Sequence, residues 1–135
     1  MTQTAFGAQS YRRVATETAT PGQRVAMLYD GAIRFLERAL GGFQADDPLE
    51  RNQTIHNNIV RAQAILHELN ACLNCEAGGE LAAALRRVYL YSDWRLDESN
   101  RRKDPAGIRE IVERLTVLRD AWNEMLRRLE TPAAA

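Results

Sequence analysis

The side chains best suited to chemistry are two cysteines and two histidines in the middle of the chain. Cys72 and Cys75 form one C-x-x-C pair. A structural zinc site needs four ligands, and the sequence offers no second cysteine pair to complete one. A thioredoxin-like redox role needs a strand followed by a helix, which the pattern around the pair does not indicate. We therefore expect two reduced cysteines at a helix end, with no metal and no cofactor.

The two histidines raise a second kind of chemistry, phosphotransfer on a helical bundle. His56 and His67 fall on nearly one line of a predicted helix, about three turns apart, which is too far for both to bind one metal ion. Phosphotransfer proteins typically carry Lys and Gly one turn after the histidine, whereas residues 57–60 and 68–71 contain neither. Both histidines are interpreted as polar helix surface, and a histidine phosphotransfer bundle stays the alternative function.

Composition and the absence of catalytic motifs exclude several classes of function. No glycine-rich phosphate loop, Ser–His–Asp arrangement or inward carboxylate pair is present, so an enzyme is not expected. Eighteen basic and eighteen acidic side chains cancel, so the basic surplus typical of nucleic-acid binders is missing. No apolar run of about 18 residues and no signal-peptide pattern occur, which predicts a cytoplasmic protein without stable membrane insertion.

The elements that must position these side chains are four helices. Thr20-Pro21, Asp47-Pro48 and Asp104-Pro105 each place a capping residue before a proline suited to the first helical position. They predict helices over about 21–40, 48–75, 80–103 and from 105 to the Thr131-Pro132 stop. Short loops between long helices favour an all-α, antiparallel up-down four-helix bundle. The expected organisation is a mobile N-terminal arm (1–19), the bundle (20–131) and a disordered tail (132–135).

The helices carry more apolar surface than a bundle of four requires. The first is apolar over most of its circumference and is expected to be central. The fourth has the most regular core stripe, which includes Trp122 and ends at Leu129. Further apolar lines on the second and third helices indicate a groove for a partner helix, or core, or cover for the N-terminal arm. Their members are Val60, Ala64 and Ala71, and Ala83, Leu90 and Trp94.

The sequence as a whole resembles the flagellin-specific export chaperones of bacteria. The Leu28-Tyr29-Asp30-Gly31-Ala32-Ile33 run is specific only together with the other matches. The chain departs from the family pattern at Arg24, Ala26, Leu90, Ser92, Trp94 and Ser99. The matching positions cover nearly the whole chain and include Tyr11, 18–21, 27–33, 62–66, 68–69, Glu76, 78–81, Tyr89, Tyr91, 95–96, Asn100, Asp104 and 120–122.

The resemblance implies a monomer or weak dimer that binds the disordered C-terminal segment of flagellin. Binding would prevent premature polymerisation in the bacterial cytosol and deliver flagellin to the export gate at the membrane. The N-terminal arm would occupy part of the binding surface when it is empty, and no ATP site is implied. A helical adaptor for another partner is a further alternative. The residues expected to contact the flagellin segment are Tyr11, Val14, Tyr29, Ile33, Val60, Ala64, Ile65, Ala71, Leu90 and Trp94.

Overall fold

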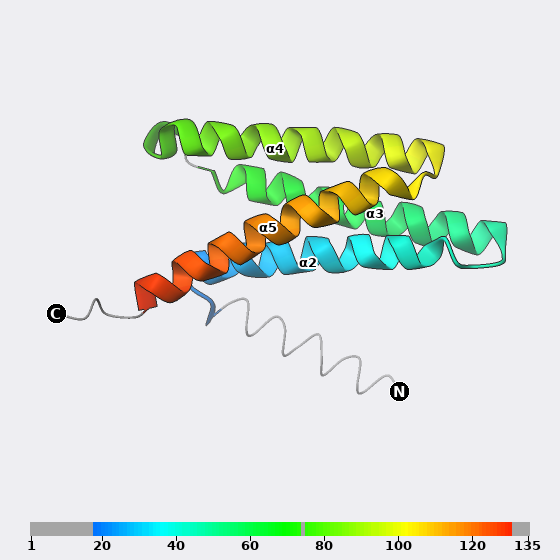
Figure 1. The fold of residues 1–135 in the computed structure, drawn as a ribbon, viewed down its shortest axis with the longest axis horizontal. Coiled ribbons are helices and arrows are strands. Elements are labelled where there is room, and N and C mark those ends of the chain that lie inside the picture. The colour runs from blue at the N-terminus through cyan, green and yellow to red at the C-terminus, as the bar shows by residue number, and fades with distance from the viewer. Residues whose placement is uncertain (1–17, 74, 131–135) are drawn as a thin grey trace.

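A computed structural model describes residues 18–73 and 75–130, without the side chains of residues 75–77. Within these residues the chain forms four helices (Figure 1): α2 (Pro21–Gly42), α3 (Pro48–Ala71), α4 (Cys75–Arg102) and α5 (Pro105–Glu130). The predicted all-α fold is confirmed. The predictions for most of the N-terminal arm and for the C-terminal tail lie outside the described residues.

Side-chain caps start the helices as the sequence predicts. At α2, the Thr20 hydroxyl accepts the Gln23 N–H at 3.1 Å and the Gln23 side chain accepts the Thr20 N–H at 3.0 Å. This reciprocal capping box satisfies two backbone donors that the helix itself cannot pair. Asp47 accepts the N–H of Glu50 at 3.2 Å before α3, and Asp104 accepts that of Ala106 at 3.0 Å before α5.

The helix ends differ from the prediction on either side of the cysteine pair. α3 stops at Ala71 rather than near residue 75, and α4 begins at Cys75 rather than near residue 80. The Gly78-Gly79 pair does break the helical path, but as a kink within α4. Gly79 has φ 55° and ψ −131°, a region that glycine reaches without steric cost.

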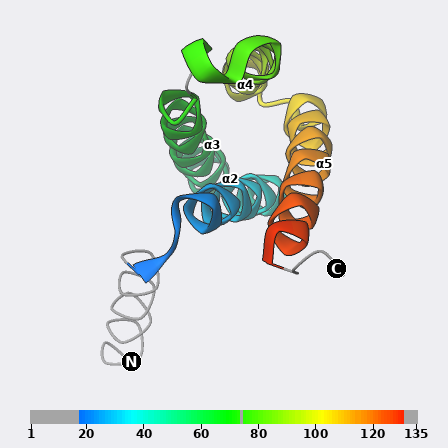
Figure 2. The same cartoon turned by 90° about the vertical axis from the view of Figure 1, so that its left-hand side faces the viewer.

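The four helices stand at the corners of a square when the bundle is viewed from its end (Figure 2). α2 packs against α3 and α5, and α4 packs against the same two helices from the opposite corner. α2 is therefore one corner of the square rather than its centre. Its Tyr29 nevertheless reaches across the diagonal, where its hydroxyl hydrogen-bonds that of Tyr89 on α4. Burial raises the pKa of both phenols, so both stay neutral.

Contacts between neighbouring helices show that they run antiparallel. Along the α3–α4 seam, His56 meets Asn100 at 2.9 Å and His67 meets Asp93 at 3.3 Å, so residue numbers rise on α3 as they fall on α4. Between α2 and α3, Gly42 lies beside Thr54 and Gly31 beside Ile65, so the numbers again run in opposite directions. These contacts agree with the predicted up-down order.

The core is concentrated in the half of the bundle where α5 begins. α2 and α3 contribute buried aliphatic side chains along most of their lengths, whereas the buried positions of α5 stop at Leu115. Farther along the same stripe, Trp122 is only half-buried and Leu129 is 76% exposed. The fully buried large apolar side chains are Leu36, Ile55, Ile59, Leu66, Leu69, Leu96, Ile108, Ile111 and Leu115.

α4 contributes polar as well as apolar side chains to this core. Ser92 and Ser99 are buried beside Tyr89 and Leu96, while Leu81 is 70% exposed. Gly107 lets α5 start close to this side of α4, because a Cβ there would lie 2.0 Å from the Ser99 Oγ. α5 therefore begins against the end of α4.

One carboxylate holds the α4–α5 contact together. Glu110 accepts the Tyr91 hydroxyl at 2.5 Å and the Arg95 Nε at 3.1 Å, and pairs with Arg114 at 3.4 Å. The hydrogen bond from Tyr91 and the bonds and charge of Arg95 stabilise the ionised form, which lowers the pKa of Glu110. The Arg114 guanidinium also lies 4.9 Å from the centre of the Tyr91 ring.

Replacing Glu110 with Gln is expected to reduce the free energy of unfolding by on the order of 1 kcal/mol at pH 7, because the charged acceptor is lost. Since the pKa of Glu110 is lowered on folding, its contribution is complete above the unfolded carboxylate pKa of about 4.3 and disappears as the pH falls through the lower folded value. Urea unfolding from pH 7 to pH 3 should show the two proteins converging. A constant difference across that range would contradict this role.

Candidate partner-binding groove

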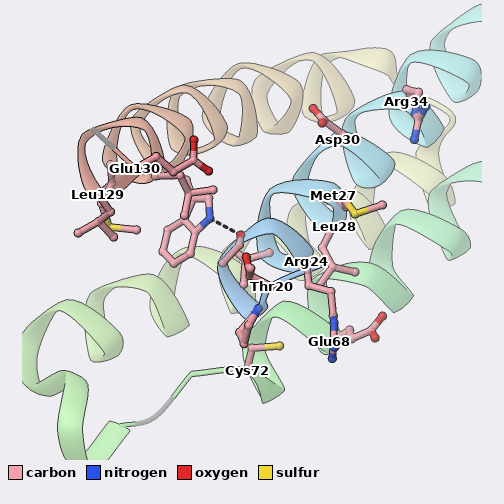
Figure 3. A pocket seen from close by; sticks show the side chains of 16 residues that line it. Thr20, Arg24, Met27, Leu28, Asp30, Arg34, Glu68, Cys72, Leu129 and Glu130 are labelled. Carbon is pink, nitrogen blue, oxygen red and sulfur yellow. Dashed lines mark hydrogen bonds between the residues drawn. The ribbon is translucent and has the colours of Figure 1, made fainter. Parts of the chain in front are cut away.

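A large concave surface lies at the end of the bundle where α5 finishes. It is an open groove of about 1340 Å³ formed by the first half of α2, the end of α5 and the end of α3 (Figure 3). α2 forms the middle of the groove, and α3 and α5 flank it. None of the α4 residues that the structure describes lines it. The groove therefore occupies the α2 side of the square.

The apolar lining comes from α2 and α5. Leu28 and Val25 of α2 are half-buried, as is Trp122 of α5, whereas Met125 is 40% exposed. Leu129, one turn farther along α5, is the most exposed of these side chains. Methionine adapts its shape to different partners, and Met27 and Met125 both border the groove. The surface is apolar, open and adaptable.

Close contact between the start of α2 and the end of α5 fixes the groove's shape. The Trp122 Nε1 donates a 2.8 Å hydrogen bond to the Gly22 carbonyl (Figure 3). A Cβ on Gly22 would lie 2.7 Å from the end of the Leu126 side chain, so a larger residue would force that side chain to move. One turn earlier on α5, Arg119 pairs with Asp30. The indole is thus oriented by its polar edge, and it packs against the core while it also lines the groove.

Charges of both signs surround the apolar lining. Arg24 and Arg34 of α2 are exposed, and Glu68 of α3 and Glu130 of α5 are exposed on the two flanks. An amphipathic helix laid in such a groove would bury its apolar side chains and keep its flanking charges near these residues. The groove therefore fits a helical peptide better than a small polar ligand.

Two residues predicted to contact the flagellin segment do not line an open surface. Tyr29 and Ile33 are buried in the core, where Tyr29 is bonded to Tyr89. The apolar face of α2 is wide because two neighbouring helices cover it, so the middle of that face is core. Ile65 is half-buried at the α2–α3 contact, opposite Gly31. Tyr11 and Val14 lie outside the described residues.

Four other predicted contact residues lie away from the groove, on both sides of the α3–α4 seam. Val60 and Ala64 are exposed on α3, seven and three residues before His67 and hence on its helix line. Leu90 and Trp94 are exposed on α4 beside Asp93. The tenth predicted residue, Ala71, is exposed at the end of α3. The structure thus separates the predicted residues instead of gathering them into one site.

The one cysteine whose side chain is described lies apart from the two histidines. Cys72 is exposed beside the groove, and His56 and His67 lie along the α3–α4 seam. Among the side chains of residues 18–73 and 78–130, no cluster of three or more His, Cys, Asp or Glu residues could hold a metal ion. None of the helices in those ranges is long and apolar enough to cross a membrane.

Sequence reasoning missed the groove residues at the end of α5. Met125 and Leu129 continue a regular apolar stripe, and such a stripe predicts core. The length of this stripe was the one sign in the sequence that part of it could be exposed. Its apolar positions from Ile108 to Leu129 extend about 30 Å at 1.5 Å per residue. Only the part of this stripe that ends at Leu115 is buried.

Comparison with known proteins identifies the family. The family model described as Flagellar protein FliS matches residues 4–129. The chain belongs to the FliS family. It is 33% identical over 117 residues to the flagellar secretion chaperone FliS of Bacillus subtilis, covering 87% of this chain and 84% of that protein. It is 32% identical over 126 residues to the flagellar secretion chaperone FliS of Salmonella typhimurium, covering 90% and 91%.

The FliS family model matches almost all of the described chain, including the helices that form the groove. The FliS of Campylobacter jejuni, named a flagellar secretion chaperone as well, is 30% identical over 121 residues that cover 90% of each chain. The matched region of the FliS model includes all of α2, α3 and α4 and all but the last residue of α5. Membership confirms the resemblance found in the sequence and places this chain among chaperones.

Trp122→Ala is expected to lower the free energy of unfolding by about 2 kcal/mol, because the side chain is only partly buried. A fully buried aromatic side chain typically costs roughly 3–5 kcal/mol when it is replaced by Ala. Trp122→Phe keeps the ring contacts and loses the bond to Gly22, for about 1 kcal/mol. Urea unfolding measures both. Leu115→Ala, at a fully buried position of the same helix, is the control and should cost about 3 kcal/mol. A Trp122→Ala loss larger than that of the control would place the indole in the core.

Proposed function

We propose that this FliS-family chain is an export chaperone in the bacterial cytoplasm, and that it holds the C-terminal segment of flagellin, here called the flagellin tail, as a helix in the α2–α5 groove. The observation that carries the proposal is the open apolar surface of Val25, Leu28, Met125 and Leu129 in a member of a chaperone family. A chain that is being exported must stay unfolded and unpolymerised, so its chaperone needs adaptable apolar contacts rather than a reactive site.

The physical basis is coupled folding and binding. A disordered segment loses conformational entropy when it becomes ordered, so it needs a large apolar contact, typically about 1,000–3,000 Å². The groove runs along the first half of α2 and the end of α5, and it offers apolar side chains over several turns. A helical tail would pack against α2, between the ends of α3 and α5. Affinity would come from apolar burial, without nucleotide or metal.

The N-terminal arm is proposed to compete for the same groove. Residues 1–17 immediately precede Thr18, and Thr20 itself lines the groove. Because the arm is tethered at this point, its effective concentration at the groove is high even if its contact is weak. Release at the flagellar export gate would then combine tail dissociation with return of the arm.

Leu129→Glu is expected to weaken binding of the flagellin tail at least about tenfold, because a charge would face the apolar side of the bound helix. Leu129 is exposed in the empty protein, so the change should leave the melting temperature nearly unaltered. Val117→Glu is the matched control, since Val117 is 68% exposed on the same helix but does not line the groove. Calorimetric titration of each protein with the cognate tail measures the difference.

Flagellin that lacks its C-terminal segment should show no binding in the same titration, and a chelator should have no effect. Equal binding of full-length and tail-deleted flagellin would overturn the proposed partner segment. Equal weakening by Leu129→Glu and Val117→Glu would overturn the proposed position while leaving the partner intact.

A further inference from the structure

We propose that Phe35, Arg38 and Arg61 form a carboxylate-binding site at the contact between α2 and α3, and that this site holds the terminal carboxylate of the flagellin tail. The inference rests on the proposed function, because it places the end of the segment that the groove is proposed to bind. It also sets the direction of the bound helix, which would run parallel to α2 with its last residue near Arg38.

Two guanidinium groups from neighbouring helices meet at one aromatic ring. The Arg38 Cζ lies 5.5 Å and the Arg61 Cζ 5.7 Å from the centre of the half-buried Phe35 ring. Attraction between a guanidinium and the face of an aromatic ring restrains such side chains. Both arginines are exposed, so their N–H groups are accessible to a ligand. The site is thus preorganised for an anion.

Neither guanidinium has a counter-ion among the residues that the structure describes. Arg95 of α4 and Arg119 of α5, in contrast, each pair with a carboxylate. Two like charges beside one ring repel each other, and an anion bound between them would offset this repulsion. A carboxylate suits the position, because its two oxygen atoms can accept hydrogen bonds from both guanidiniums.

The site continues the groove at its basic end. Arg34 lines the groove at the end of the α2 segment opposite Thr20 (Figure 3), and Arg38 follows one turn later on the same side of the helix. Among the described residues, the carboxylate closest to them in the chain, Glu37, forms an ion pair with neither. From Thr20 to Arg38, α2 extends about 27 Å, the length of a helix of about 18 residues. A helix that fills the groove would therefore bring one of its ends to the site.

The other end of the groove disfavours a carboxylate. α3 ends there at Ala71 and α5 at Glu130, and the C-terminal end of a helix carries about half a negative elementary charge. Glu68 and Glu130 add two carboxylates, against the guanidinium of Arg24 and the positive N-terminal end of α2. The C-terminal end of a bound helix is itself negative and would be repelled there. The bound tail should therefore place its C-terminal end at the opposite, basic end.

Two synthetic flagellin-tail peptides that differ only at the C-terminus test the proposal. One ends in a free carboxylate and the other in an amide, which carries no charge. Calorimetric titration of the full chain should show that amidation weakens binding at least about fivefold, because the ion pairs with two guanidiniums are lost. In the Arg38→Gln/Arg61→Gln double variant, the two peptides should bind with equal affinity.

The matched control is Arg87→Gln/Arg109→Gln, which removes two exposed guanidiniums from α4 and α5 that do not line the groove. This variant should keep the full difference between the two peptides, and the melting temperature of each variant verifies its fold. Equal affinity of the two peptides for the wild type would overturn the carboxylate site. An undiminished difference in Arg38→Gln/Arg61→Gln would overturn its position. Failure of both peptides to bind the wild type would instead overturn the proposed function on which the inference rests.

A nitroxide attached near the C-terminus of the free-carboxylate peptide tests the direction of the bound helix. It should broaden the backbone NMR signals of residues 34–38 and 58–62 of the chain and leave those of residues 20–24 sharp. Stronger broadening at residues 20–24 than at residues 34–38 would overturn the parallel direction.

Discussion

The structure depends on the path of α5 across the bundle. Its first turns are held against α4 by Gly107 and by the Glu110 cluster, and its last turns are held against the start of α2 by Trp122. A straight helix fixed at these two places cannot keep its whole apolar stripe in contact with one core. The stripe is buried as far as Leu115 and then emerges into the groove. The groove is therefore a consequence of the direction in which α5 crosses the bundle.

This path also keeps the groove away from α4. The groove is lined by the start of α2, the end of α3 and the end of α5, and α4 stands at the corner of the square opposite α2 (Figure 2). α4 contributes Ser92 and Ser99 to the core and exposes Leu90 and Trp94, so part of its apolar character faces outward. We propose the groove as the binding site of the flagellin tail, because the apolar Met125 and Leu129 are exposed there.

Local signals predicted the fold well because they act over a few residues. The caps at Thr20, Asp47 and Asp104 each need only a side chain and a backbone N–H within one turn. The site was harder to predict because exposure depends on the angle between helices. The buried Ile108 and the exposed Leu129 share one periodic pattern, and nothing in that pattern marks where burial stops along α5. On the wide apolar face of α2 the difference has the opposite sense. Tyr29 and Ile33 were predicted to contact the flagellin segment, and the structure buries both in the core.

The most direct test of the account is amide hydrogen exchange on the full chain, with and without a saturating amount of the flagellin-tail peptide. If the tail forms a helix in the groove, protection should increase in the first half of α2 and in α5 after residue 118, and α4 should exchange at its original rate. Added protection confined to α3 and α4, with α2 and the end of α5 unchanged, would contradict the assignment of the groove.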